Sequence, residues 1–241
     1  MTGRRGQASI ESLIAIVFAL FVLVMVALLA TQKNNEGTDL KVKTDAKRVA
    51  TSVADNINMI AEQGSGFYRY FSVPEKLYGD NEYSISINGS LVEIDSGNYT
   101  MLKQMITSNV TVACLDKGFE KKNKVYSDQE NITIICNLPE LMIINNSFRT
   151  SDARANATMN VSIGIINFGP VDSGPFKVRF NDTIDVSIPL LRSEEKREVF
   201  VNMTAPPTRG PYPVAVGVDF ENNVTESIES NNFYNGTINV A

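Results

Sequence analysis

The side chains that most often do chemistry in proteins are scarce in this chain of 241 residues. It has no histidine, and its only two cysteines are Cys114 and Cys136. Without histidine the chain lacks the usual general base, the usual pH switch and a common metal ligand. Two thiols alone cannot complete a four-ligand zinc site. We therefore expect no metal, no cofactor and no catalytic residues, and a protein that is not an enzyme.

A group of acidic and amide side chains lies near the C-terminus, at Asp219, Glu226, Glu229, Asn231 and Asn232. Carboxylate and amide oxygens are the ligands that calcium prefers, so this group could bind a calcium ion. The same residue types also form turns between strands by bonding to their own backbone. No fixed-loop ligand spacing supports calcium, and we favour the turn interpretation.

Asn-x-Ser/Thr sequons occur at eleven positions, all of them after residue 87. Their confinement to one part of the chain favours an extracytoplasmic, glycosylated surface. The alternative is that Asn and Thr merely enrich the polar surface of β-strands. The candidate glycosylation sites are Asn88, Asn98, Asn109, Asn131, Asn145, Asn156, Asn160, Asn181, Asn202, Asn223 and Asn235.

Residues 13–30 form an uninterrupted run of uncharged, almost wholly apolar residues. As a helix this run reaches roughly 27 Å, near the thickness of the bilayer core. Arg4 and Arg5 precede it, so the N-terminus should stay in the cytoplasm and the rest of the chain outside. An ordinary secretory signal has a shorter apolar region and a small-x-small site, which residues 28–30 match poorly. A plain membrane anchor would gain nothing from Glu11 at the edge of the run.

The segment RRGQASIESL, residues 4–13, resembles the class III signal peptide of archaeal type IV pilins. The resemblance implies that a prepilin peptidase recognises Gly6, Gln7, Ser9 and Glu11 and cleaves after Gly6, which makes residues 1–6 a leader. It also implies assembly through Glu11 and Leu13, with Glu11 meeting the terminal amine of a neighbouring subunit. Leu13 falls earlier than the last position of the family pattern Q-x-S-x-E-x-x-x-L. Cyclisation of Gln7 would remove the amine, and Glu11 would then need another donor.

The polar sequence after residue 30 keeps a helical period. Its apolar stripe recurs every three or four residues, at Val42, Ala46, Val49, Val53, Ile57 and Ile60. The glycines of Gly64-Ser65-Gly66 should end the helix. We expect one pilin helix over residues 7–63, roughly 85 Å long. Its first half, with residues 13–30 in the membrane or filament core, is apolar all round, and its second half should pack on a globular head.

Residues 64–138 predict a small β-rich head domain. Apolar residues alternate with polar ones up to a hairpin turn at Asn88-Gly89. Two further strands, residues 110–114 and 132–136, end at the cysteines, and the Lys- and Asp-rich stretch between them is expected to be a loop or hairpin tip. Outside the cell, a Cys114–Cys136 disulfide is favoured over two free thiols. It would stabilise the head by about 3 kcal/mol.

Residues 139–241 predict about seven short strands and hence an immunoglobulin-like β-sandwich. The segment GPYPVAVGVD, residues 210–219, and the turn Asn167-Phe168-Gly169 resemble the CARDB family of modules associated with cell adhesion. The expected fold class is therefore α+β: a long N-terminal pilin helix, a small disulfide-linked β domain and a C-terminal sandwich.

We expect a structural or adhesive subunit of a pilus-like surface filament, with its C-terminus outside. Its expected partners are other pilin subunits, the prepilin peptidase, the membrane before assembly, and a cell-surface or carbohydrate ligand of the sandwich. The net charge of −5, without a basic cluster, argues against nucleic acid. The main alternative is a membrane-anchored surface binding protein that does not polymerise. An archaellin is less favoured because archaellins usually begin with Gly-rich segments.

Overall fold

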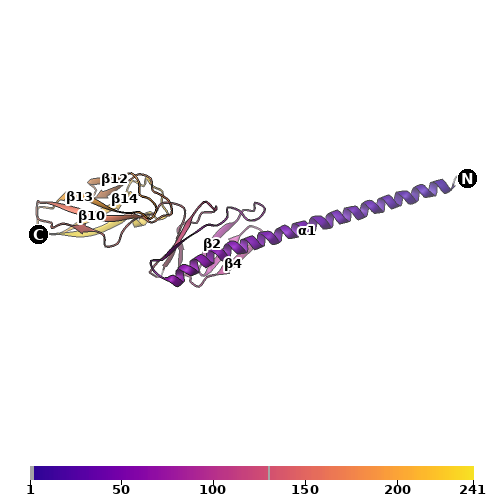
Figure 1. Ribbon diagram of the computed structural model, residues 1–241, viewed down its shortest axis with the longest axis horizontal. Helices are drawn as coiled ribbons and strands as arrows, with labels where there is room; N and C mark the ends of the chain where they lie inside the picture. Colours follow the sequence, from indigo (N-terminus) through magenta and orange to yellow (C-terminus); the bar gives the residue numbers. More distant parts are fainter. Residues whose placement is uncertain (1–2, 130) are drawn as a thin grey trace.

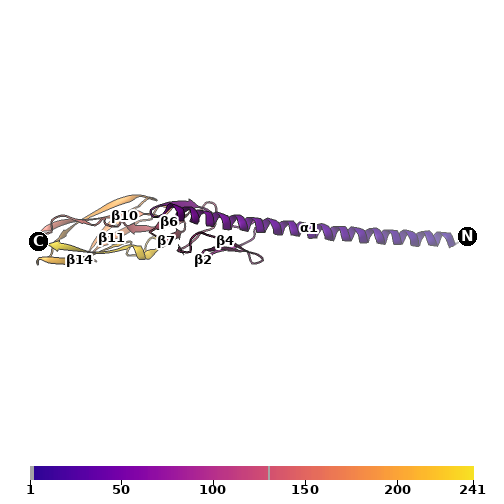
Figure 2. The ribbon, with the colours of Figure 1, turned by 90° about the horizontal axis from the view of Figure 1, so that it is seen from below.

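The computed structural model describes residues 3–129 and 131–241, and within these ranges the side chains from residue 13 onward. The molecule is an elongated rod (Figures 1 and 2). Helix α1 (Gly3–Gln63) projects from a β-rich head, and a second β domain continues the rod to the C-terminus. This arrangement confirms the expected α+β class.

Helix α1 ends at the glycines that the sequence marked as its stop. Gly64 has φ of +85°, a backbone conformation that glycine adopts without steric cost. Its amide still donates to the carbonyl oxygen of Ile60, 3.1 Å away. The chain then turns away from the helix axis, and the first strand of the head begins at Tyr68.

The head contains two sheets that pack against the second half of α1. One is antiparallel, with strands in the order β2 (Ser84–Asn88), β3 (Leu91–Asp95) and β4 (Thr100–Gln104). In it, Asn88 faces Leu91 across the predicted turn, where Gly89 has φ of +58°. The other sheet has the order β1 (Tyr68–Phe71), β6 (Asn123–Asp128), β7 (Asn131–Ile135) and β5 (Val110–Val112).

The expectation of a loop or hairpin tip between the cysteine strands is wrong. Strands β5 and β7 run parallel, and a third strand, β6, lies between them in the sequence and pairs with β7 and β1. A tight hairpin can join only antiparallel strands, so the parallel pair needs this long connection. The strand escaped prediction because Asn123 and Lys124, polar residues that suggest a loop, are fully buried in it.

The C-terminal domain is a sandwich of two antiparallel sheets. The first has the order β13 (Lys196–Thr204), β10 (Thr158–Asn167) and β8 (Leu141–Ile143), and β9 (Arg149–Thr150) also pairs with β10. The second has the order β12 (Ile184–Ile188), β11 (Phe176–Phe180), β14 (Gly210–Val218) and β15 (Phe233–Val240), with the short helix η1 (Glu229–Asn231) before β15. The predicted β-sandwich is thus present.

Each β domain has its own hydrophobic core. In the head, buried side chains of α1 such as Val53 and Ile57 pack against strand residues such as Val92 and Ile134. In the sandwich, the inward faces of both sheets meet in a separate cluster that includes Phe180. The two domains can therefore keep their folds independently, and their relative position depends on the contacts at their junction.

Candidate functional site

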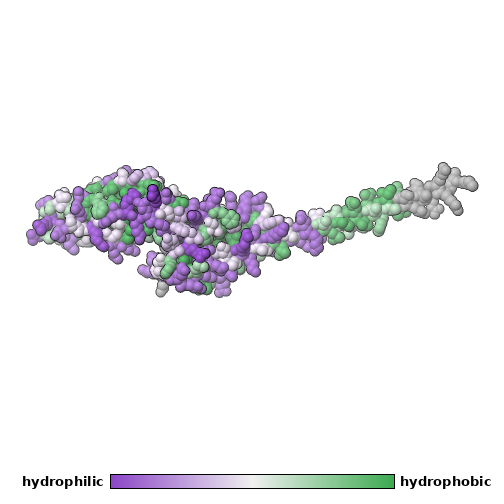
Figure 3. Space-filling model, in the orientation of Figure 1, coloured by the Kyte–Doolittle hydropathy of each residue, from purple (hydrophilic) through white to green (hydrophobic). Residues whose placement is uncertain are grey.

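The first half of α1 presents apolar side chains to solvent on every side. In residues 13–30 the large hydrophobic side chains are between 43% exposed, at Val22, and 67% exposed, at Phe18. The mean hydropathy of this part reaches 3.3, and none of it is buried within the chain. Figure 3 shows it as a continuous apolar surface next to the polar remainder. Apolar surface of this extent requires lipid or protein around it.

The residues predicted for leader processing and assembly lie at the start of this helix. Gly6, Gln7, Ser9 and Glu11 fall within the helical backbone of α1, but their side chains lie outside the described part of the structure. Leu13 is 64% exposed and belongs to the apolar surface. The predicted peptidase site therefore belongs to the same helix that carries the apolar surface.

The second half of the same helix is covered by the head. The predicted stripe from Val42 to Ile60 is buried, with no member more than 5% exposed. Contacts with β3, β4, β6 and β1 cover it. The helix thus links an uncovered apolar rod to a folded body, and the boundary between the two lies in the polar residues that follow residue 30.

The junction between head and sandwich is built around a buried lysine. Lys124 of β6 donates from Nζ to the carbonyl oxygen of Phe168 at 2.7 Å and to Glu194 Oε1 at 2.6 Å. Its ammonium lies 3.1 Å from the ring centroid of Phe168 and 4.0 Å from that of Tyr68. The Tyr70 hydroxyl donates to the same Glu194 oxygen. Two head tyrosines and one head lysine thereby hold two loops of the sandwich.

Burial shapes the electrostatics of this junction. It lowers the pKa of Lys124 to about 8, and the hydrogen bond to Glu194 acts in the opposite direction. Burial also raises the pKa of Tyr70, and Glu194 raises it further. The Phe168 ring packs edge-on against Tyr126 at 4.9 Å and Tyr68 at 6.0 Å between centroids. Lys124 and Glu194 partner each other, so the junction positions the two domains.

The predicted disulfide is present and lies at the same junction. Cys114 and Cys136 are bonded, and no free cysteine remains. The Ser227 hydroxyl of the sandwich is the donor toward this bridge, with its Oγ 3.3 Å from Cys114 Sγ and 3.8 Å from Cys136 Sγ. The bridge therefore fixes the loop after β5 to the end of β7 and forms part of the head surface that meets the sandwich.

Two buried glutamates fasten the loop before β15 to the start of β8. Glu140 accepts from the Ile228 amide at 3.1 Å and from Asn231 Nδ2 at 2.6 Å. Glu226 accepts from the Leu141 amide at 2.6 Å and from Asn232 Nδ2 at 3.0 Å. Burial raises the pKa of Glu140 to about 7 and that of Glu226 to about 8, and the nearby Glu140 also raises the pKa of Glu226.

The acidic and amide group considered for calcium forms turns and loop contacts. Asp219 accepts from the amides of Asn223 at 3.1 Å and Val224 at 2.8 Å, and Glu229 accepts from the amide of Glu226 at 3.3 Å. Within the described residues, no group of three or more His, Cys, Asp or Glu side chains is placed to hold a metal ion. These hydrogen bonds support the turn interpretation.

The sequon asparagines lie on the surface of both β domains. All of them are exposed except Asn181, which is half-buried and accepts from the Ala215 amide at 2.9 Å. Asn160 and Asn202 face each other across β10 and β13 on the outer side of the first sheet. Asn235 lies on β15 of the second sheet. Sequon asparagines are thus present on both sheets of the sandwich and around the head.

Sequence reasoning missed the junction residues Lys124, Phe168 and Glu194. A lone lysine in a polar stretch and a glutamate in a loop carry no signal of burial or pairing. The sequence pattern does indicate a turn at Asn167-Phe168-Gly169, and the structure shows why this turn is tight. A Cβ at Gly169 would lie 2.3 Å from the carbonyl oxygen of Leu138, so only glycine fits against the interdomain segment.

Comparison with known proteins bears on the sandwich. The CARDB family model matches residues 138–236. No curated protein matches the chain. The CARDB domain of a Pyrococcus furiosus protein, crystallised in complex with di-metal ions, is 24% identical; the match covers 43% of this chain and 90% of that one, with a TM-score of 0.36. A domain of a Methanosarcina acetivorans protein, whose name assigns it to the cell surface, is 25% identical; coverage is 43% and 93%, and the TM-score is 0.37.

The family match begins at the interdomain segment and ends within β15. It includes Phe168 and Glu194, the two residues of the sandwich that hold Lys124 of the head. It also includes the carboxylate pair and seven of the sequon asparagines from Asn145 to Asn235. The C-terminal part of this chain is therefore a CARDB domain, carried on a disulfide-bonded β head at the end of a long, partly apolar helix.

Proposed function

We propose that the protein is a structural and adhesive subunit of an archaeal type IV pilus-like filament. It polymerises through the first half of α1 and displays the head and the CARDB domain outside the cell. The observation that carries this proposal is the contrast within one helix: an all-round apolar half with no cover in the chain, continuous with a half whose apolar stripe is packed against the head. A bundle of such helices would bury each apolar half against its neighbours.

The processing motif supports the same proposal. Cleavage after Gly6 would remove Arg4 and Arg5, the charges that keep the N-terminus at the cytoplasmic surface, and would leave the apolar helix on the mature chain. Glu11 would then meet the terminal amine of a neighbouring subunit, which offsets the cost of a carboxylate among apolar helices. The prepilin peptidase and further copies or relatives of this subunit are the partners that this mechanism requires.

The distribution of sequons agrees with a display role for the β domains. Exposed sequon asparagines occur on both sheets of the sandwich and on the head, whereas α1 has none. Bulky glycans keep a surface hydrated and hinder close packing of subunits through it. Contacts between subunits would then be made through the helix, and the sandwich would be left to meet a cell-surface or carbohydrate ligand. No nucleic acid and no catalysis enter this function.

The first test is the mass of the N-terminal peptide of the protein from its own cells, together with electron microscopy of the cell surface. A peptide that begins at Gln7, cyclised or not, and filaments that contain this chain are the expected results. Glu11→Gln should leave cleavage intact and reduce filament formation, and Gly6→Val should block cleavage. A chain that begins after residue 30 would contradict the proposal, because the assembly helix would then be removed.

A second candidate is a membrane-anchored surface binding protein that does not polymerise. It is favoured by the length of the apolar run, since lipid would cover residues 13–30 as well as neighbouring helices would. The two candidates differ after detergent extraction of membranes. A filament subunit sediments as a polymer and cross-links to copies through α1, whereas an anchored monomer is released as a single chain.

A further inference from the structure

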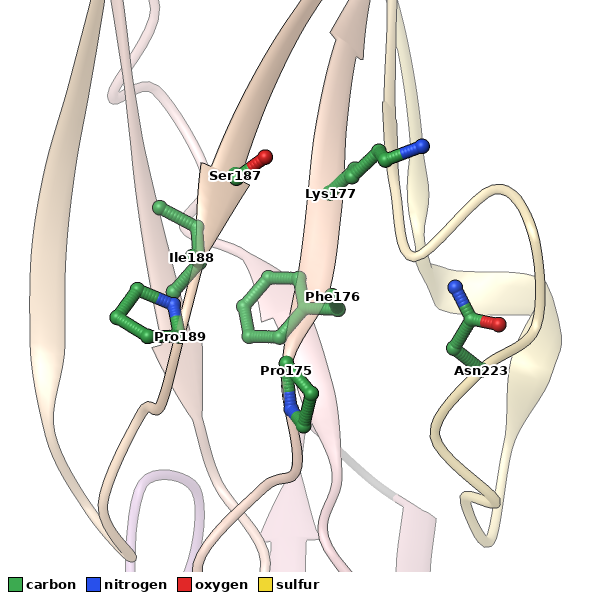
Figure 4. A pocket seen from close by; sticks show the side chains of 7 residues that line it. All are labelled: Pro175, Phe176, Lys177, Ser187, Ile188, Pro189 and Asn223. Atoms are coloured by element: carbon green, nitrogen blue, oxygen red, sulfur yellow. The ribbon is translucent and has the colours of Figure 1, made fainter.

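A groove lies on the second sheet of the CARDB domain, between the ends of two strands and one loop (Figure 4). Its volume is about 540 Å³. That value falls within the range of roughly 300–1,000 Å³ that small-ligand sites occupy. The residues that line it are Pro175, Phe176, Lys177, Ser187, Ile188, Pro189 and Asn223.

The strands give the groove an apolar surface with polar edges. In the ladder of β11 and β12, Phe176 pairs with Ile188, and Lys177 pairs with Ser187. Phe176 and Ile188 are 2% and 5% exposed and belong to the sandwich core beneath the groove, whereas the flanking prolines, Pro175 and Pro189, are exposed and supply its apolar surface. Figure 4 shows Lys177 and Ser187 next to Phe176 and Ile188 along the two strands, and the alternation of the strands places them on the solvent side of the sheet. A sugar ring matches this surface, since it has apolar C–H faces and hydroxyl edges.

The loop across the groove is held in a fixed conformation. Both carboxylate oxygens of Asp219 accept amides of the loop, from Asn223 and Val224, and the Asp219 amide donates to the carbonyl oxygen of Lys177 at 2.8 Å. The side chain of Asn223 is oriented as well: its Nδ2 donates to Glu221 Oε2 at 3.0 Å, and Glu221 Oε1 accepts from Lys177 Nζ at 2.8 Å. Asn223 is thus aligned through Glu221 by Lys177, which lines the groove.

Asn223 is also the first residue of the sequon Asn223-Val224-Thr225. We infer that the groove seats the first sugars of an N-linked glycan attached to Asn223. This inference rests on the glycosylated surface that is part of the proposed function. The attachment atom belongs to a residue that lines the groove, so a glycan on it starts at the groove edge. Its sugar faces would cover the prolines, and its hydroxyls would reach Lys177 and Ser187.

The attachment step is compatible with the geometry. An oligosaccharide bonded through C1 to a lipid phosphate donor is transferred to Asn223: the C1–Nδ2 bond forms, the C1–O bond to phosphate breaks, and one Nδ2 proton is lost. The phosphate keeps the electron pair of the broken bond. One hydrogen remains on Nδ2, and that hydrogen can still bond to Glu221. The fixed amide direction is thereby retained in the product.

The test uses the full-length protein isolated from its own cells. Glycopeptide mass spectrometry gives the occupancy of Asn223, and acylation of surface amines gives the reactivity of Lys177, with Lys196 as an internal reference. Thr225→Ala removes the sequon and keeps the Asn223 side chain. Asn235→Gln removes another exposed sequon asparagine of the same sheet. We expect Lys177 to react several-fold faster in Thr225→Ala than in the wild type, and to be unchanged in Asn235→Gln.

An unmodified Asn223 would overturn the inference, and so would equal reactivity of Lys177 in the wild type and Thr225→Ala. An increase in Asn235→Gln of the same size would also overturn it, because the shielding would then be general and not due to the glycan at Asn223. N-terminal processing and filament formation are measured on the same Thr225→Ala cells. Loss of either would bear on the proposed function alone, since the sandwich that carries the groove and the N-terminal half of α1 lie at opposite ends of the rod (Figure 1).

Discussion

The two halves of α1 belong to one continuous helix, yet they have opposite relations to the rest of the molecule. Residues 13–30 are exposed on all sides and contact nothing within the chain. The stripe from Val42 to Ile60 is buried under the two sheets of the head. Hydrophobicity alone does not explain which half is buried, because the exposed half is the more apolar of the two. What differs is the period: the second half has one apolar face that a single domain can cover, and the first half has none.

The comparison predicts that a new charge affects folding in the second half of α1 and membrane insertion in the first half. Val53 is fully buried, so Val53→Asp should destabilise the head by roughly 3–5 kcal/mol, because the carboxylate has no partner there. Val24→Asp, at a side chain that is 52% exposed, should leave thermal unfolding of the detergent-solubilised protein unchanged. It should instead impair membrane insertion, at a cost of about 3 kcal/mol. Equal melting shifts in the two variants would contradict the comparison.

The covered region should also depend on its disulfide. Replacing both Cys114 and Cys136 by serine should destabilise the head by about 3 kcal/mol, because the unfolded chain regains the freedom of the closed loop. Urea unfolding with and without reductant measures this effect in the wild type, and the double variant should not respond to the reductant. The same double replacement in a chain that lacks residues 1–30 should cause the same loss, since residues 13–30 add nothing to the stability of the head.

The junction should determine whether head and sandwich behave as one body. Phe168→Ala removes the ring that packs against Tyr68 and Tyr126 and covers the Lys124 ammonium. We expect a loss of about 2 kcal/mol from the coupling of the domains. Limited proteolysis near residues 137–139 should become faster. Phe200→Ala, at a side chain of the outer sandwich surface that is 63% exposed, is the matched control and should not change it.

A pH dependence is expected of the CARDB domain. The pKa values of Glu140 and Glu226 are raised in the folded state, so the folded domain binds protons that the unfolded chain has released. The stability that they contribute is complete below the unfolded pKa and is lost as pH rises through the folded pKa. The melting temperature of the sandwich should therefore decrease as the pH is raised from 5 to 7.5. Glu226→Gln should reduce that slope, and an unchanged slope would refute its assignment to Glu226.

Several parts of the fold could be predicted because local chemistry decides them. The apolar stripe and Gly64 define the covered half of α1 and its end, and Asn88-Gly89 defines a hairpin. The strands of the sandwich were expected as a group, and the regular alternation of β11 and β12 shows why. The pairing of Cys114 with Cys136 followed from the expected compartment. Processing at Gly6 and Gln7 and assembly through Glu11 stay predictions.

The sequence by itself determined the long helix, the hairpin at Asn88-Gly89 and the order of helix, head and sandwich, because period, turn residues and apolar length are local properties. Only the tertiary structure decided the parallel pairing of β5 and β7, the burial of Lys124 and its contacts with Phe168 and Glu194. These contacts join residues 44 and 70 positions apart. A buried charge is tolerated only where distant groups converge on it, and a linear pattern contains no record of that convergence.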